Sequence, residues 1–282
     1  MPDGRLLADL VAADPRGWLG AEHVELHGID PTFIVKLVDA GERLFLHAHP
    51  DRTFAHDHLA SPYGKAEGWV ILEANPGAVV HLGFSRDVGV AELAGWVAHQ
   101  DTAKMIEATN KVPVSAGDAV FCPGGLPHAI GAGILFAEIQ EPTDLTVLLE
   151  WHGFPVNGPE TGHLGLGFET ALGCVDRARW DPTRVTELFD TRSGSSSPVG
   201  VTRLLPPAAD AFFTVEHIVP AVPVELSARF SVLLVTDGHG IASFSSSGPI
   251  DLGRGQALVV PHAAGSLTLS GAVSVLRFGA AR

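Results

Sequence analysis

Two stretches of the chain, one in each half, share the same short design. They read VSAGDAVFCPGGLPHAI at residues 114–130 and DLGRGQALVVPHAAGSL at residues 251–267. Each has a turn with glycine, an apolar strand, and then a proline with a histidine close behind. A repeat built from strands and turns predicts two related β-barrel modules in tandem.

The composition agrees with a mainly β fold. The chain has 32 Gly and 20 Pro against 18 Lys plus Arg, and this balance favours short strands joined by tight turns over a helical bundle. At 87–110 apolar residues recur at i, i+3 and i+4, which predicts a helical insertion. We therefore expect a first barrel at 1–150, a helical connector and linker at 151–200, and a second barrel at 201–282.

Charge and cysteine content exclude several classes of partner. The formal net charge is −14 and there is no basic run, which argues against nucleic acid and anionic membranes as partners. The start of the chain lacks a signal peptide, and no apolar stretch is long enough to span a bilayer. Two cysteines, Cys122 and Cys174, cannot build a disulfide framework. We expect a cytoplasmic protein, and no pattern indicates its oligomeric state.

A candidate metal site begins at His47-Ala48-His49, at the end of an apolar run. On a strand, residues i and i+2 point to the same face, so both imidazoles can converge on one ion. Glu67 opens the next strand and can add a carboxylate, and His128 follows the glycine-rich turn. Three histidines and one glutamate suit Zn, Mn, Fe, Co or Ni, so we expect one divalent ion in the first barrel.

Because the chain has 14 His, a His-x-His spacing can also arise by chance. His56-Asp57-His58 has the same spacing but a helical pattern, and residues i and i+2 diverge on a helix. It serves as an internal control. His239 and His262, in the second module, have no matching His-x-His or Glu, so that module is predicted to be metal-free.

Several segments in order resemble the type I mannose-6-phosphate isomerases, a family of metal-dependent cupins. The resemblance covers about residues 30–150 and rests on His47–Asp51, Gly64–Glu67, Pro123–Ile130 and Glu138–Gln140. It implies that the two modules are cupin-like jelly-roll barrels, the first with the helical insertion. The family's metal ligands fall on His47, His49, Glu67 and His128, and zinc is the ion that the resemblance implies.

The resemblance implies interconversion of mannose 6-phosphate and fructose 6-phosphate through an enediolate, whose charge a cation stabilises. Lys65 lies two residues from Glu67 and would share its face on a strand, which makes it the candidate for proton transfer. The alternative is a lysine in a surface turn. Glu138 and Gln140 alternate on one face and either line the pocket or are paired at the barrel rim.

The chain also departs from the family. His47 stands where the family has glutamine, and Leu145–Leu149 lacks the arginine that the family ties to the phosphorylated substrate. Arg52, with Arg86 as a second candidate, is the expected substitute for binding phosphate. Two alternatives to a sugar-phosphate isomerase stay open: an isomerase or epimerase of a non-phosphorylated sugar, and a non-catalytic sugar-sensing cupin.

Overall fold

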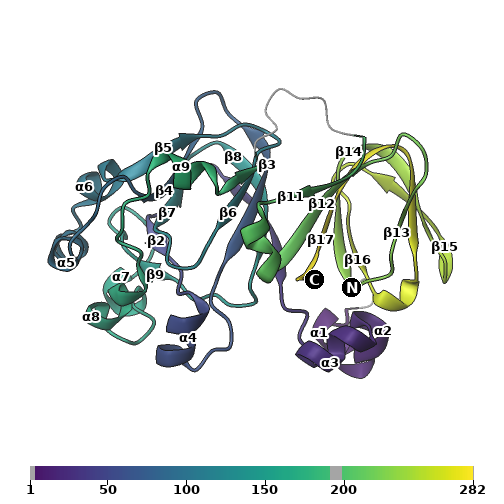
Figure 1. Ribbon diagram of the computed structural model, residues 1–282, viewed down its shortest axis with the longest axis horizontal. Helices are drawn as coiled ribbons and strands as arrows, with labels where there is room; N and C mark the ends of the chain where they lie inside the picture. The colour runs from purple at the N-terminus through teal and green to yellow at the C-terminus, as the bar shows by residue number, and fades with distance from the viewer. Residues whose placement is uncertain (1–3, 191–198, 282) are drawn as a thin grey trace. The chain divides into compact units, whose positions relative to one another are not determined.

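The computed structural model describes residues 4–190 and 199–281, which form two compact units (Figure 1). The larger unit comprises residues 36–190 and 205–209, and the smaller unit comprises residues 4–35, 199–204 and 210–281. Contacts therefore group residues 4–35 with the C-terminal strands, and residues 151–190 with the strands that precede them. Residues 191–198, near the end of the predicted connector and linker at 151–200, lie outside the described residues.

Two five-stranded sheets form the larger unit (Figure 1). The first has the order β1-β8-β3-β6-β10 and consists of β1 (Ile34–Ala40), β3 (Glu67–Ala74), β6 (Ala119–Cys122), β8 (Ile134–Gln140) and β10 (Phe189–Asp190). The second has the order β5-β4-β7-β2-β9 and consists of β2 (His47–Ala48), β4 (Val79–Phe84), β5 (Thr109–Pro113), β7 (His128–Ile130) and β9 (Val147–Leu148).

The chain alternates between the two sheets, which share one apolar core. Trp69 and Phe136 from the first sheet pack with Val80, Leu82 and Ile130 from the second. In the described part of the chain no strand pairing joins the two sheets, so they do not close into the predicted barrel. Two of the edge strands, β9 and β10, have only two residues each, too short to carry a ladder across to the other sheet.

Helices cover the other face of the second sheet. The helical insertion contains α5 (Val90–His99) and α6 (Thr102–Glu107). Leu93, Trp96 and Met105 from this insertion share a core with Phe84 and Ala129 of the sheet. The other short helices of this unit are α4 (Arg52–Leu59), α7 (Gly158–Thr161), α8 (Phe168–Ala171), η1 (Leu172–Cys174) and α9 (Pro182–Thr186).

The smaller unit is a seven-stranded sheet with the path β11-β12-β17-β14-β15, to which β13 and β16 add at β17 and β14. Its strands are β11 (Gly200–Leu204), β12 (Phe213–Val219), β13 (Val224–Leu226), β14 (Ser231–Phe244), β15 (Ser247–Gly253), β16 (Ala257–Val260) and β17 (Leu267–Ala280). Its helices are α1 (Leu7–Ala13), α2 (Pro15–Leu19), α3 (Ala21–His27) and η3 (His262–Ala264), and η2 (Pro207–Ala211) lies at the border of the units.

The N-terminal helices belong to the smaller unit because α2 packs against η3. Gly20 has a φ of 94° and lies so near the His262 ring that an added Cβ would stand 2.7 Å from it. Only glycine permits both the conformation and this approach. The fold is mainly β, as predicted, and among the described residues no helix is long and apolar enough to cross a membrane.

Candidate metal centre

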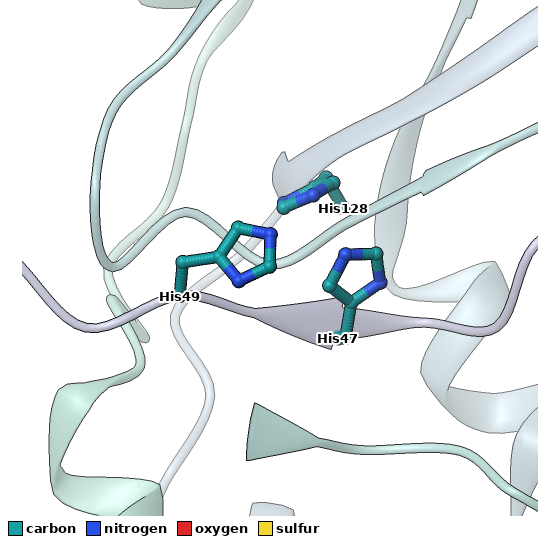
Figure 2. Close-up of side chains that lie close together, drawn as sticks. All are labelled: His47, His49 and His128. Carbon is teal, nitrogen blue, oxygen red and sulfur yellow. The ribbon is translucent and has the colours of Figure 1, made fainter. Parts of the chain in front are cut away.

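Strand pairing in the second sheet brings the three predicted histidines together. His47 on β2 and His128 on β7 are direct partners across an antiparallel pair, and His49 follows two residues after His47. Figure 2 shows the three imidazoles gathered at one place. Their ring centroids are 4.2 Å apart for His47 and His128, 4.8 Å for His47 and His49, and 5.1 Å for His49 and His128.

Backbone carbonyls orient all three rings in the same way. Nδ1 of His47 lies 2.9 Å from the Phe45 carbonyl oxygen. The corresponding distances are 2.7 Å from His49 to Leu145 and 2.8 Å from His128 to Leu126. A carbonyl oxygen only accepts, so each Nδ1 carries the hydrogen and each Nε2 keeps a lone pair. This arrangement is typical of histidines that bind a metal ion through Nε2.

Glu67 completes the cluster from the first residue of β3. Its Oε1 lies 3.0 Å from His49 Nε2, and its Oε2 lies 3.6 Å from His128 Nε2. His128 is 1% exposed, yet its Nε2 has no hydrogen-bond partner. A buried polar atom without a partner costs free energy, and a cation held by these lone pairs would remove that cost. The residues present therefore fit a divalent ion.

The electrostatics of the cluster favour deprotonated ligands. Burial holds the pKa of His47 and of His49 below the ordinary value, and it lowers the pKa of His128 to about 4. Burial alone would raise the pKa of Glu67, but its interactions with His49 and Lys65 bring that pKa well below its usual range. At neutral pH the set is three neutral imidazoles and one carboxylate.

Lys65 is buried beside the cluster rather than exposed in a surface turn. Its Nζ lies 3.2 Å from Glu67 Oε1 and 3.3 Å from His49 Nε2, and the residue is 7% exposed. Its backbone N–H donates to the Pro50 carbonyl at 2.9 Å. At Gly64, the residue before it, an added Cβ would stand 2.6 Å from the Pro50 carbonyl oxygen. The sharp turn thus requires glycine and directs Lys65 inward.

Glu138 and Gln140 lie on β8 of the first sheet, which pairs with the strand of Glu67, β3. Trp69 pairs with Glu138, and Glu67 pairs with Gln140, across the β3–β8 ladder. Glu138 Oε1 is buried without a hydrogen-bond partner. Burial, and then the neighbouring Glu67 charge, raise the pKa of Glu138 to about 8. Gln140 is fully buried and its Nε2 donates to the Thr143 carbonyl at 2.6 Å.

The two predicted arginines are both ion-paired. Arg52 Nε donates to Glu141 Oε1 at 2.7 Å, while 45% of the Arg52 side chain is exposed. Arg86 donates twice to Glu92, at 2.6 and 3.1 Å, on the surface. Arg52 leads into α4, directly after the ligand segment, whereas Arg86 is bound to the helical insertion.

Sequence reasoning missed Lys36. On β1, its Nζ donates to Gln140 Oε1 and lies 3.7 Å from Glu138 Oε1 and 3.8 Å from Asp144 Oδ1. A lysine in the middle of the apolar run FIVKLV was the available signal, since such a residue needs a partner. The partner, Gln140, lies more than a hundred residues away, which local patterns do not reveal.

The other histidines singled out in the sequence lie outside the cluster. His56 and His58 are exposed on α4, where His56 Nδ1 lies 3.0 Å from Oδ1 of the adjacent Asp57. In the part of the chain that the structure describes, the groups able to hold a metal ion lie in the larger unit and do not include His239 or His262.

These features define a class: a mainly β protein with a buried cluster of three histidines and one glutamate that can bind a divalent ion. No protein-family model matches the chain. It is similar to the mannose-6-phosphate isomerase of Streptococcus mutans, with 26% identity over 268 residues, 93% of this chain and 79% of that protein. Mannose-6-phosphate isomerase ManA of Bacillus subtilis is 30% identical over 125 residues, 44% of this chain and 38% of that protein.

Solved structures share the fold. A mannose 6-phosphate isomerase from Bacillus subtilis superimposes with a TM-score of 0.73 at 19% identity, covering 95% of this chain and 80% of that one. A phosphomannose isomerase from Salmonella typhimurium gives a TM-score of 0.74 at 14% identity, covering 99% and 86%. The chain is thus similar in sequence to mannose-6-phosphate isomerases and shares the fold of their solved structures.

Proposed function

We propose that the protein is a metal-dependent aldose–ketose isomerase that interconverts mannose 6-phosphate and fructose 6-phosphate. The observation that carries the proposal is the convergence of one ring nitrogen from each of three histidines, the Glu67 carboxylate and the Lys65 ammonium at one buried place. Such an isomerase must stabilise a charged enediolate and move a proton between neighbouring carbons. The cluster offers a group for each task, and the relatives are named for this activity.

His47, His49, Glu67 and His128 would hold the ion, which supplies a Lewis acid for the oxygens of the sugar. Three imidazole nitrogens and one carboxylate oxygen form a borderline-soft set. Zinc suits this set best, and Mn, Fe, Co or Ni are the alternatives. The unpartnered Nε2 of His128 supports the proposal that all four residues act together.

Lys65 is proposed to handle the proton. Both atoms that its Nζ contacts, Glu67 Oε1 and His49 Nε2, are proposed metal ligands. When those atoms are occupied, the Lys65 ammonium is available to a substrate oxygen and can donate or hold a proton there. Glu138, whose pKa is raised to about 8, and Gln140 are proposed to line the same pocket and hydrogen-bond to sugar hydroxyls.

A second candidate is an isomerase or epimerase of a non-phosphorylated sugar, and one observation favours it. The cations around the cluster are each committed to a carboxylate: Lys36 to Glu138 and Asp144, Arg43 to Glu150, Arg52 to Glu141, and Lys65 to Glu67. A phosphate dianion needs charge-assisted donors, and Leu148 cannot provide one. Arg52 is the proposed phosphate ligand because it is close to the ligand segment and partly exposed.

The test compares kcat/KM of the metal-loaded protein for mannose 6-phosphate and for free mannose. The proposal expects the phosphorylated sugar to be preferred and Arg52→Ala to remove that preference. Arg86→Ala is the matched control, because Arg86 is bound to Glu92 on the surface. Turnover of free sugars alone would favour the second candidate. No turnover of any sugar in the metal-loaded protein would leave a non-catalytic, sugar-sensing role.

The proposal also includes the architecture of the two units, the partners and the location of the protein. We propose that each unit is a cupin-like jelly roll, that the strands within 1–150 and within 201–282 form the two modules with a connector at 151–200, and that only the first module binds metal. Small sugars or sugar phosphates are the proposed partners, without nucleic acid or membrane, and the cytoplasm is the proposed location.

A further inference from the structure

Cys122 lies behind the metal centre in a position that the proposed function does not use. It is the last residue of β6 and pairs directly with Glu67 across the β3–β6 ladder. Its Sγ is 3.3 Å from Nδ1 of His128, and the residue is 1% exposed. The other cysteine, Cys174, packs in the apolar core beneath the helical insertion.

Cys122 belongs to a second group of potential ligands that overlaps with the histidine cluster. One ligand atom from each of Glu67, Cys122 and His128 lies within 4.8 Å of the others, and all three residues are buried. Ligand atoms on one tetrahedral ion with S and N donors stand about 3.5 Å apart. The observed 3.3 Å between Sγ and Nδ1 is close to that spacing.

We propose that the centre has a second, thiolate-containing mode in which Cys122, Glu67 and His128 hold a thiophilic divalent ion such as Cd²⁺. A thiolate is a soft ligand and selects soft ions over Mg²⁺ or Mn²⁺. On binding, the Cys122 S–H bond breaks, an S–Cd bond forms, and the proton leaves to solvent. His128 binds through Nδ1 and moves its hydrogen to Nε2, which faces Glu67 Oε2 at 3.6 Å. The hydrogen bond from His128 to the Leu126 carbonyl is given up.

The test loads the metal-free full-length protein with Cd²⁺ and records the sulfur-to-cadmium charge-transfer absorption in the near ultraviolet. The proposal expects this band in the wild type and in His47→Ala, because His47 belongs only to the histidine group. The band should be absent in Cys122→Ala. Cys174→Ala is the matched control, being a buried cysteine outside both groups, and should keep the band. Circular dichroism verifies that each variant is folded.

Affinity gives a second measurement that does not depend on the band. Cd²⁺ should bind Cys122→Ala at least about tenfold more weakly than the wild type, while Mn²⁺ affinity should change little. No charge-transfer band in the wild type, or an equal band in folded Cys122→Ala, would overturn the proposal. Neither measurement uses turnover, so the result is independent of the proposed isomerase activity.

Discussion

Two histidines that follow the same sequence design have different surroundings in the two units. In the larger unit, His128 follows Pro127 at the end of a turn that begins at Pro123 and returns the chain to β7, where His128 pairs with His47 on β2. At Gly124, an added Cβ would stand 2.6 Å from the Asp51 backbone. In the smaller unit, His262 likewise follows a proline, Pro261, but it begins η3 and packs near Gly20. A proline followed by a histidine becomes a ligand motif only when strand pairing directs the ring into a shared site.

Buried charges show a similar contrast. The smaller unit buries Glu216 and Arg277, and Arg229 donates to Glu216 at 2.7 Å while Arg277 donates to Ser231 and to the Ser227 carbonyl. In this network each of the three charged side chains has a hydrogen-bonding partner within the same unit. In the larger unit, His128 Nε2 and Glu138 Oε1 are buried without hydrogen-bond partners. Buried polar groups that are mutually satisfied stabilise a fold, whereas convergent unsatisfied ones indicate a binding site.

The largest expected effect comes from removing one ligand of the larger unit. His49→Ala and His128→Ala should each weaken divalent metal binding at least about 100-fold, since an incomplete ligand set loses more than an outer-shell change does. Competition with a chromophoric chelator measures the affinity. His262→Ala is the control and should bind metal as the wild type does. Equal losses of metal affinity in all three variants would contradict the difference between His128 and His262.

The next effect concerns catalysis without loss of metal. Lys65→Ala should retain the ion but lower kcat by a factor of about 10²–10⁴, the size of an acid–base contribution. Steady-state kinetics on mannose 6-phosphate, with metal content measured on the same sample, provide the test. Lys111→Ala, a change outside the cluster, should leave kcat unaffected. Near-normal kcat in Lys65→Ala would return Lys65 to a structural role.

The third prediction concerns the satisfied network of the smaller unit. Glu216→Ala leaves Arg229 and the strands around it without their buried carboxylate and should destabilise the protein by about 3 kcal/mol. Thermal or denaturant unfolding measures the loss. Metal content should not change, because the network lies in the other unit. A stable variant that had lost its metal would contradict the contrast drawn between the two kinds of buried charge.

The smallest effect is a pH dependence of the metal-free protein. Burial lowers the pKa of folded His128 from 6.5 to about 4, so the unfolded chain binds that proton more tightly. The contribution to stability is present above about pH 6.5 and is lost as the pH falls toward 4, with a slope of at most about 1.4 kcal/mol per pH unit. Glu138, with its raised pKa, has the opposite slope, so the useful quantity is the difference between wild type and His128→Asn.

Denaturant unfolding of both proteins between pH 4 and 7 gives this difference. It should grow in favour of the wild type as the pH rises through that window. Parallel stability curves would show that His128 is not held neutral by burial.

The gathering of the candidate ligands could be expected from the sequence because most of them obey a local rule. The spacing of His47 and His49 gives one strand face, and the segment Gly64–Glu67 gives both a turn and the start of the next strand. His56 and His58 were excluded by the helical pattern around them. Such rules depend on neighbours in the chain, and the structure places these residues accordingly.

Contacts between distant segments could not be predicted in this way. Lys36 and Gln140, Arg52 and Glu141, and Arg43 and Glu150 are each separated by about ninety to a hundred residues. Their pairing follows from the order of strands in the sheets, which local periodicity does not encode. The same reason explains why residues 4–35 were expected beside the first module, although α2 packs on η3.

Metal stoichiometry is the decisive measurement for the cluster of His47, His49, Glu67 and His128. Elemental analysis of the purified full-length protein, after loading and removal of free ions, should give one divalent ion per chain. X-ray absorption at the edge of that metal should show imidazole scattering from three histidines. We expect both results in the wild type, and we expect His49→Ala and His128→Ala to lose the ion. A wild-type protein without bound ion, or an ion that persists in both variants, would contradict it.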